Sequence, residues 1–195
     1  DSINNFVALR NGSFRKIIAF EPDPKNFIQL QENIAKFPSK IQSAITLYEM
    51  ATGAIKAKVS FDATGTGSSS IGLGSLMLDS IPLDEILSGC YPTYIKMDVE
   101  GSELDALIGG QKLITRCTPV LAVCAYHSQN HLWQIPLLIN SIAPKYQFFI
   151  RSHRFDAWDM VCYAIPTNRC IHPQLPSMSL EQNAISVHDE NIECI

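Results

Sequence analysis

Short apolar segments alternate with amphipathic segments along most of this chain, and that alternation limits the folds open to it. Residues Lys16–Glu21 and Val120–Ala125 carry continuous apolar runs. Runs of this length are typical of strands buried on both faces, as in a parallel sheet. After the first run, Phe27, Leu30 and Ile34 recur at helical spacing. We therefore predict an open α/β sheet, a fold that binds ligands at the carboxyl ends of its strands.

The remaining patterns extend this prediction. Helical spacing predicts further helices over residues 3–9, 103–114 and 131–142. Further strands are expected at residues 45–50, 75–79 and 94–98, and an antiparallel pair at 146–150 and 160–165. Residues 51–74 are rich in Gly, Ser and Thr and predict a hairpin or excursion. We assign residues 1–166 to one domain and residues 167–195 to a loosely ordered C-terminal tail.

The composition argues against several classes of protein. The 195-residue chain is 46% hydrophobic and 17% charged, unlike a disordered chain. A net charge of −4 without a basic stripe argues against nucleic-acid binding. No apolar stretch approaches the ~20 residues of a membrane span, and no signal peptide is visible. The six cysteines form no CxxC pair, so we expect reduced thiols in a cytoplasmic protein.

An acidic residue, Glu21, ends the first predicted strand. A carboxylate at this edge of the sheet can accept hydrogen bonds from both hydroxyls of a nucleotide ribose. A solvent-exposed acid at a strand end fits the sequence equally well. Asp23 and Pro24 follow and predict a helix start, with Asp23 as the N-cap.

A second acidic group lies between the predicted strand 94–98 and the helix that follows. Asp98 and Glu100 precede this helix and could hold a cation, take up a proton or bind a hard metal ion. Glu103 begins the helix, where the helix dipole alone can account for a negative charge. His127 ends the strand expected to lie beside Asp98, so it is a further candidate for acid–base chemistry.

Four segments of the sequence form a recognisable set: Phe-Glu-Pro-Asp-Pro at 20–24, Ile-Lys-Met-Asp-Val-Glu-Gly-Ser-Glu at 95–103, Ala-Tyr-His at 125–127 and Cys-Tyr-Ala-Ile-Pro at 162–166. Together they resemble the FkbM family of S-adenosylmethionine-dependent methyltransferases. The resemblance extends from about residue 14 to residue 166. It implies a class I methyltransferase fold, which is Rossmann-like and mostly parallel with an antiparallel last strand. By this resemblance, the family's first strand, at the centre of the sheet, and its glycine-rich loop should precede the first helix, so we expect the native protein to be longer than this sequence.

The same resemblance implies an activity and a set of roles. Family members are mainly O-methyltransferases that act on sugars or other hydroxylated natural products. Glu21 would hold the ribose of S-adenosylmethionine, Ala51 would lie by the adenine, and Asp98 would lie near the transferring methyl group. Asp98, Glu100 and His127 are the candidate catalytic residues, with Glu100 and His127 as candidates for activating an acceptor hydroxyl.

Alternatives to this enzyme reading stay open at the level of sequence. One is a methyltransferase-like domain that serves only as a binding or scaffold module, and another is a different nucleotide-using α/β enzyme such as a dehydrogenase. We assign no metal ligands, although a metal-assisted variant would use Asp98, Glu100 and His127. The expected partner is a small-molecule or carbohydrate acceptor, with no nucleic acid and no membrane. The sequence leaves the oligomeric state open.

Overall fold

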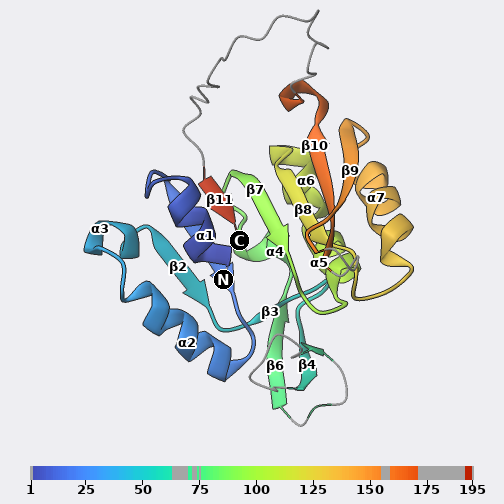
Figure 1. Ribbon diagram of the computed structural model, residues 1–195. Helices are drawn as coiled ribbons and strands as arrows, with labels where there is room; N and C mark the ends of the chain where they lie inside the picture. The colour runs from blue at the N-terminus through green and yellow to red at the C-terminus, as the bar shows by residue number, and fades with distance from the viewer. Residues whose placement is uncertain are drawn as a thin grey trace, which may run out of the picture.

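The computed structural model describes residues 2–62, 70–71, 74, 76–154, 159–170 and 192–194. Its centre is a sheet of seven strands in the order β2-β1-β11-β7-β8-β10-β9 (Figure 1). The strands are β1 (Lys16–Phe20), β2 (Ile45–Tyr48), β7 (Pro92–Met97), β8 (Val120–Cys124), β9 (Tyr146–Ser152), β10 (Met160–Pro166) and β11 (Ile192–Cys194). The first five in this order are mutually parallel, and β10 runs antiparallel to both of its neighbours. The predicted open α/β sheet with an antiparallel late strand is confirmed.

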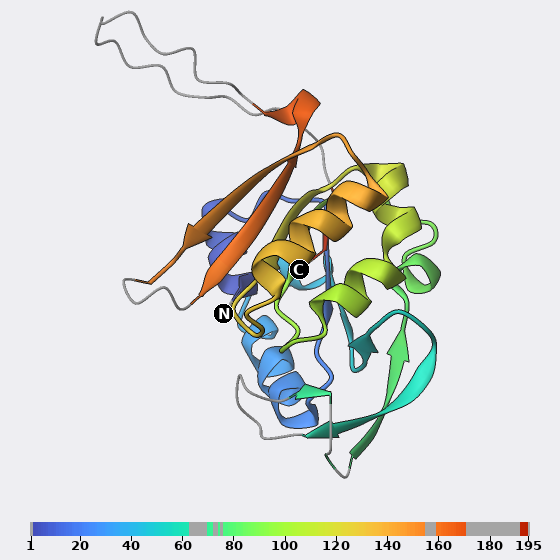
Figure 2. The same cartoon turned by 90° about the vertical axis from the view of Figure 1, so that its right-hand side faces the viewer.

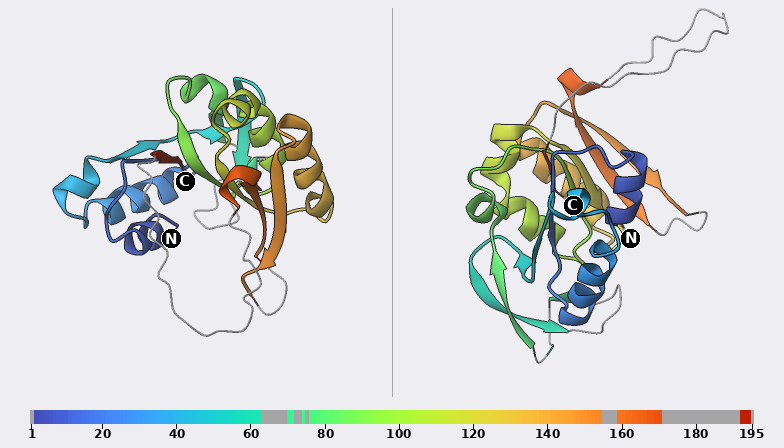
Figure 3. Two further views of the ribbon diagram at one scale, coloured as in Figure 1. Left: turned by 90° about the horizontal axis from the view of Figure 1, so that it is seen from above. Right: turned by 90° about the vertical axis from the view of Figure 1, so that its left-hand side faces the viewer.

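Helices cover both faces of the sheet (Figures 2 and 3). They are α1 (Ser2–Leu9), α2 (Pro24–Ile34), α3 (Ser39–Gln42), α4 (Leu83–Ile86), α5 (Glu103–Gly109), α6 (Gln111–Cys117), α7 (His131–Ile142) and the 3-10 turn η1 (Thr167–Arg169). One core joins α4–α7 to β7, β8 and β10, and a second joins α1 and α2 to β1 and β2. In β1, Ile17 and Ala19 face the second core and Ile18 faces the first, as expected of a strand buried on both faces. No helix among the described residues combines the length and apolar character needed to cross a membrane.

The predicted excursion after β2 forms a sheet of its own below the main one (Figure 1). It contains β3 (Ala51–Thr52), β4 (Ala57–Asp62), β5 (Ser70–Ile71) and β6 (Leu76–Ile81), in the order β3-β6-β4-β5. The strand expected at 75–79 is therefore β6 and belongs to this second sheet. Residues 63–69, 72, 73 and 75 of the predicted excursion and strand lie outside the described residues.

The helix expected over residues 103–114 is divided into α5 and α6. Gly110, with φ −110° and ψ 9°, ends one helix and begins the next. Glycine weakens a helix interior, and the carboxylate of Asp84 favours a new start. Its oxygens accept hydrogen bonds from Lys112 N at 3.0 Å and Leu113 N at 2.7 Å. The prediction of one continuous helix was wrong because this cap comes from a distant part of the chain.

Part of the predicted C-terminal tail belongs to the main sheet. Residues 171–191 and 195 of that tail lie outside the described residues, but Ile192–Cys194 form β11. This strand pairs in parallel with β1 on one side and β7 on the other. It occupies the place between them where the resemblance puts the family's first strand. The tail therefore differs from the expectation of a wholly loose segment, because β1 and β7 both offer unpaired backbone groups at this position.

Candidate functional site

A cavity of about 460 Å³ opens at the carboxyl ends of β1 and β7. Its walls come from the start of α1, the end of β1, one side of α2, and the end of β7 with the loop that follows it. Glu21 and Asp98 both line it. Two acidic residues that are 77 positions apart in the sequence therefore border one space. This is the edge of an open α/β sheet at which ligands bind.

Glu21 owes its position to the turn that ends β1. Its backbone N donates to Tyr48 O at 3.0 Å, and Asp23 N donates to Glu21 Oε1 at 2.9 Å. Asp23 is fully buried and caps α2 by accepting from Lys25 N at 2.8 Å, with Pro24 at the first helical position. The predicted helix start is thus confirmed. Burial raises the pKa of Glu21 above its usual value, against the effect of the hydrogen bond from Asp23 N.

Asp98 follows β7 and is held on two sides. Lys96 Nζ lies 2.8 Å from Oδ2, and the Tyr126 hydroxyl donates to Oδ1 at 3.0 Å. Burial acts to raise the pKa of Asp98, but the charge of Lys96 and the hydrogen bonds to the carboxylate outweigh it and lower the pKa overall. Asp98 is therefore an ionised carboxylate at the border of the cavity.

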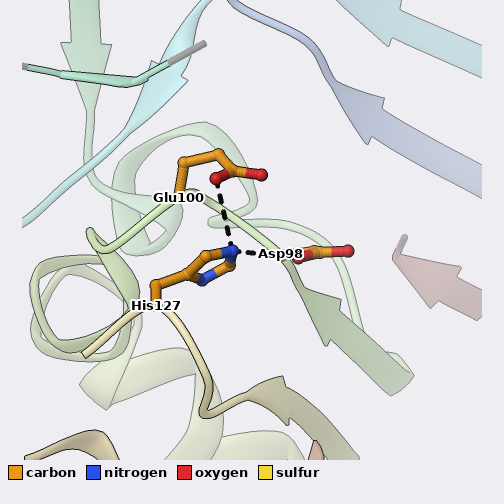
Figure 4. Close-up of side chains that lie close together, drawn as sticks. All are labelled: Asp98, Glu100 and His127. Atoms are coloured by element: carbon orange, nitrogen blue, oxygen red, sulfur yellow. Dashed lines mark ion pairs between the residues drawn. The ribbon is translucent and has the colours of Figure 1, made fainter. Parts of the chain in front are cut away.

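The loop after Asp98 turns sharply and directs Glu100 toward His127. Glu100 has φ 49° and Gly101 has φ 98°, so two consecutive residues have left-handed backbone conformations. Such a conformation costs free energy for a residue other than glycine and is characteristic of functional loops. Glu100 Oε2 lies 3.3 Å from His127 Nε2 (Figure 4). Burial raises the pKa of Glu100, although the nearby His127 opposes this effect.

His127 follows β8, the neighbour of β7 in the sheet, and is fixed by Glu103. Its side chain is 8% exposed, and Nδ1 lies 2.7 Å from Glu103 Oε1. A carboxylate only accepts hydrogen bonds, so the proton on this side belongs to Nδ1. Nε2 then points toward Glu100 and, at 3.7 Å, toward Asp98 Oδ1 (Figure 4). Burial works against protonation, but the three carboxylates around the ring raise the pKa of His127 overall.

The structure gives Glu103 a role that the sequence analysis missed. Its side chain is fully buried, so the helix dipole at a solvated helix start does not account for it. Oε1 also accepts from Val99 N at 3.1 Å, and Oε2 lies 3.2 Å from Nδ1 of a second buried histidine, His131. Burial would raise the pKa of Glu103, but the hydrogen bond and charge of His127 lower it overall. A signal was present, because Glu103 shares one helix face with the apolar Ala106 and Leu107.

The predicted site residues thus fall into two groups. Asp98, Glu100 and His127 come together, with one donor atom from each within 4.8 Å of the others. Glu21 lies at the same cavity as Asp98 but outside this cluster. Ala51 is buried, and the cavity wall includes its neighbour Thr52 rather than Ala51 itself. The arrangement combines a cavity with an acidic rim and a neighbouring cluster that can exchange a proton or hold a cation.

Comparisons with known proteins agree with the resemblance seen in the sequence. The family model of the methyltransferase FkbM domain matches residues 1–160. The structure is similar to the crystal structure of methyltransferase FkbM from Methylobacillus flagellatus KT, with 31% sequence identity and a TM-score of 0.73. This similarity covers 84% of the present chain and 40% of that chain, so the present chain spans less than half of its length. A search of curated proteins gives no match.

Proposed function

This chain belongs to the FkbM methyltransferase family, and we propose that it takes part in the transfer of a methyl group from S-adenosylmethionine to a hydroxyl group. The observation that carries the proposal is the pair Glu21 and Asp98 at one cavity, beside the cluster of Glu100 and His127. A nucleoside cofactor and a hydroxylated acceptor need two such adjoining regions. The reaction class is that of EC 2.1.1.

The cavity suits a nucleoside in size and chemistry. Its volume of about 460 Å³ falls within the range of small-molecule sites. Glu21 would accept hydrogen bonds from the ribose hydroxyls, and Asp98 would lie by the methionine part. Thr52 lines the cavity next to Ala51, which stays a predicted neighbour of the adenine. When bound, S-adenosylmethionine supplies a methyl group that is activated by its positively charged sulfur.

The cluster beyond Asp98 would act on the acceptor. A hydroxyl group is a poor nucleophile until its proton is drawn away, so a proton acceptor or a cation must lie close to it. His127 Nε2 faces Asp98 and Glu100, while Glu103 holds the opposite side of the ring in place. In sites that activate a nucleophile, one side chain commonly orients a second one, which takes up the proton. Glu103 would orient His127 in this way.

The proposal extends to partners and location. We propose a small-molecule or carbohydrate acceptor, without nucleic acid or membrane as a partner. The five cysteines whose side chains are described, Cys90, Cys117, Cys124, Cys162 and Cys170, are all free. Free thiols suit a reducing compartment, so the cytoplasm is the proposed location.

Calorimetric titration of S-adenosylhomocysteine tests the cofactor site. We expect binding to the unaltered chain and a loss of at least about tenfold in affinity for Glu21→Ala, because hydrogen bonds to a charged group are lost. Glu32→Ala is the matched control, since Glu32 is an exposed acid on α2. Equal affinities for all three proteins would contradict the assignment of Glu21. Binding without methyl transfer to any hydroxylated acceptor would favour the scaffold alternative.

A further inference from the structure

We propose that Asp98, Glu100 and His127 form a binding site for one divalent cation of the Mn²⁺ type, next to the cofactor cavity. The proposal rests on the proposed function for its biological meaning, since the cation would activate the acceptor hydroxyl. The site itself is inferred from the contacts, burial and charge of these three residues and of the groups that hold them.

The spacing of the three donor atoms suits a single ion. His127 Nε2 lies 3.3 Å from Glu100 Oε2 and 3.7 Å from Asp98 Oδ1, and the whole set lies within 4.8 Å. Neighbouring ligands around a six-coordinate ion with bonds of about 2.1 Å are ~3 Å apart. A small inward movement of the two carboxylates therefore completes one face of an octahedron. Three positions remain open for water or an acceptor oxygen.

The state of His127 Nε2 is the independent sign of a ligand. The side chain is more than nine-tenths buried, and Nε2 makes no well-formed hydrogen bond in the described part of the structure, although Glu100 Oε2 lies 3.3 Å away. Because Nδ1 donates to Glu103, Nε2 is the ring atom that faces the two carboxylates. A positive charge is needed between Nε2 and these carboxylates, and either a proton on Nε2 or a metal ion can supply it. A metal ion bound by all three groups would take the place of that proton.

The surroundings also favour a cation. Glu103 Oε1 holds Nδ1 of His127 at 2.7 Å, which is the carboxylate–histidine arrangement that orients a metal-binding imidazole. Lys96 at 2.8 Å from Asp98 Oδ2 neutralises one carboxylate only. Asp98, Glu100 and Glu103 together carry more negative charge than Lys96 and a protonated His127 offset. Two carboxylates and one imidazole favour Mn²⁺ over an ion that prefers oxygen ligands alone. Zinc would compete with Mn²⁺ for the same site in vitro.

The position of the site indicates what the cation would do. Asp98 belongs both to the cluster and to the wall of the cofactor cavity. An acceptor hydroxyl bound at an open position of the ion would therefore lie next to the cofactor. The cation would stabilise the negative charge that develops on its oxygen, and the proton would pass to solvent water. Nε2 would then serve as a ligand rather than as the proton acceptor.

Titration of the metal-depleted chain with Mn²⁺, followed by the electron paramagnetic resonance of free Mn²⁺, tests the site. We expect one bound ion per chain and a loss of affinity of at least about tenfold for both Glu100→Gln and His127→Gln. Asp105→Asn is the matched control, because Asp105 is an exposed acid on α5 near the cluster. Its affinity should equal that of the unaltered chain. If His127→Gln fails to fold, Glu100→Gln decides the question, since its side chain is partly exposed.

The outcomes separate this inference from the proposed function. Absence of Mn²⁺ binding, or binding that neither variant weakens, would overturn the cation site. S-adenosylhomocysteine is titrated into the same samples, and its binding reports on the cofactor site alone. Binding of S-adenosylhomocysteine without binding of Mn²⁺ would therefore contradict the cation site and leave the methyltransferase proposal standing. Mn²⁺ binding that depends on Glu100 and His127 without cofactor binding would support the site and count against the proposed function.

Discussion

At the scale of single residues, Glu103 is the fully buried acid of the site. It contacts His127, His131 and the backbone of Val99. A buried carboxylate is tolerated only when hydrogen bonds and charges satisfy it. Glu103 therefore couples the loop after β7 to the start of α7 and sets the direction of the His127 ring.

Replacement of Glu103 should cost much of the stability of the protein. Glu103→Ala leaves the buried His127 without the acceptor of its Nδ1 proton and His131 without its neighbouring carboxylate, and we expect a loss of about 3 kcal/mol in the free energy of unfolding. Urea denaturation followed by circular dichroism measures this difference. Asp105→Ala, an exposed acid on the same helix, should change the value by less than about 0.5 kcal/mol. Similar losses for both variants would show that the buried contacts of Glu103 contribute little.

Glu21 should make cofactor binding depend on pH in a specific direction. Its pKa is raised above 4.5, mainly by burial, so it takes up a proton at a higher pH than an ordinary glutamate. The protonated form accepts ribose hydrogen bonds less well, so affinity for S-adenosylhomocysteine should fall as the pH is lowered through that raised pKa. Glu21→Gln cannot titrate, and its deficit in binding free energy relative to the unaltered chain should shrink on acidification. A constant deficit across pH 4–8 in calorimetric titrations would contradict this role of Glu21.

At the scale of elements, the contact between α5 and the second sheet is unusually close. A Cβ added at Gly109 would lie 2.0 Å from Gly53 O and 3.2 Å from Pro82 Cα. Both neighbours are backbone atoms, so neither can move without shifting a strand or a helix start. The contact fixes the second sheet against the helix that begins with Glu103.

This contact predicts different effects for two glycine substitutions. Gly109→Ala should destabilise the protein by about 3 kcal/mol, because the added methyl group overpacks a backbone contact. Gly89→Ala should change the free energy of unfolding by less than about 0.5 kcal/mol, since nothing lies within 4 Å of the added Cβ. Thermal or urea unfolding of the two variants measures the difference. If the Gly109→Ala and Gly89→Ala variants have the same free energy of unfolding, the contact between α5 and the second sheet can open at little cost.

Most elements could be predicted from local patterns, and the exceptions have physical causes. The helix over His131–Ile142 and the antiparallel pair β9 and β10 are confirmed, because their periodicity reflects which faces are buried. The break between α5 and α6 was missed, since its cap, Asp84, lies 28 residues from Lys112 in the sequence. A pattern within a short window contains no information about such a partner.

At the scale of the whole molecule, the central feature is β11 between β1 and β7. Glu193 lies opposite Ile17 on one side and Tyr94 on the other. The strand pairs with the first residues of β1 and with the first part of β7, and the last residues of these two strands line the cavity. Integrity of the cavity should therefore depend on residues close to position 193.

A proline within β11 tests this arrangement. Glu193→Pro removes a backbone N–H from the middle of a sheet, and we expect a loss of about 2 kcal/mol in the free energy of unfolding, together with weaker S-adenosylhomocysteine binding. Glu193→Ala retains the N–H and serves as the control. If the proline and alanine variants are equally stable and bind S-adenosylhomocysteine equally well, the pairing of β11 with β1 and β7 does not stabilise the protein in solution.

The sequence alone was sufficient for the features that depend on neighbours along the chain. Apolar runs and helical spacing predicted the strands of the main sheet other than β11 and most of its helices. Glu21 and Asp98 were expected at the carboxyl edge of this sheet because each follows a buried strand. The tertiary structure decided what depends on distant neighbours. It buried Glu103 against His127 and His131, and it inserted β11 between β1 and β7. Burial, desolvation and strand pairing arise from packing between remote segments, and local periodicity does not record which segments meet.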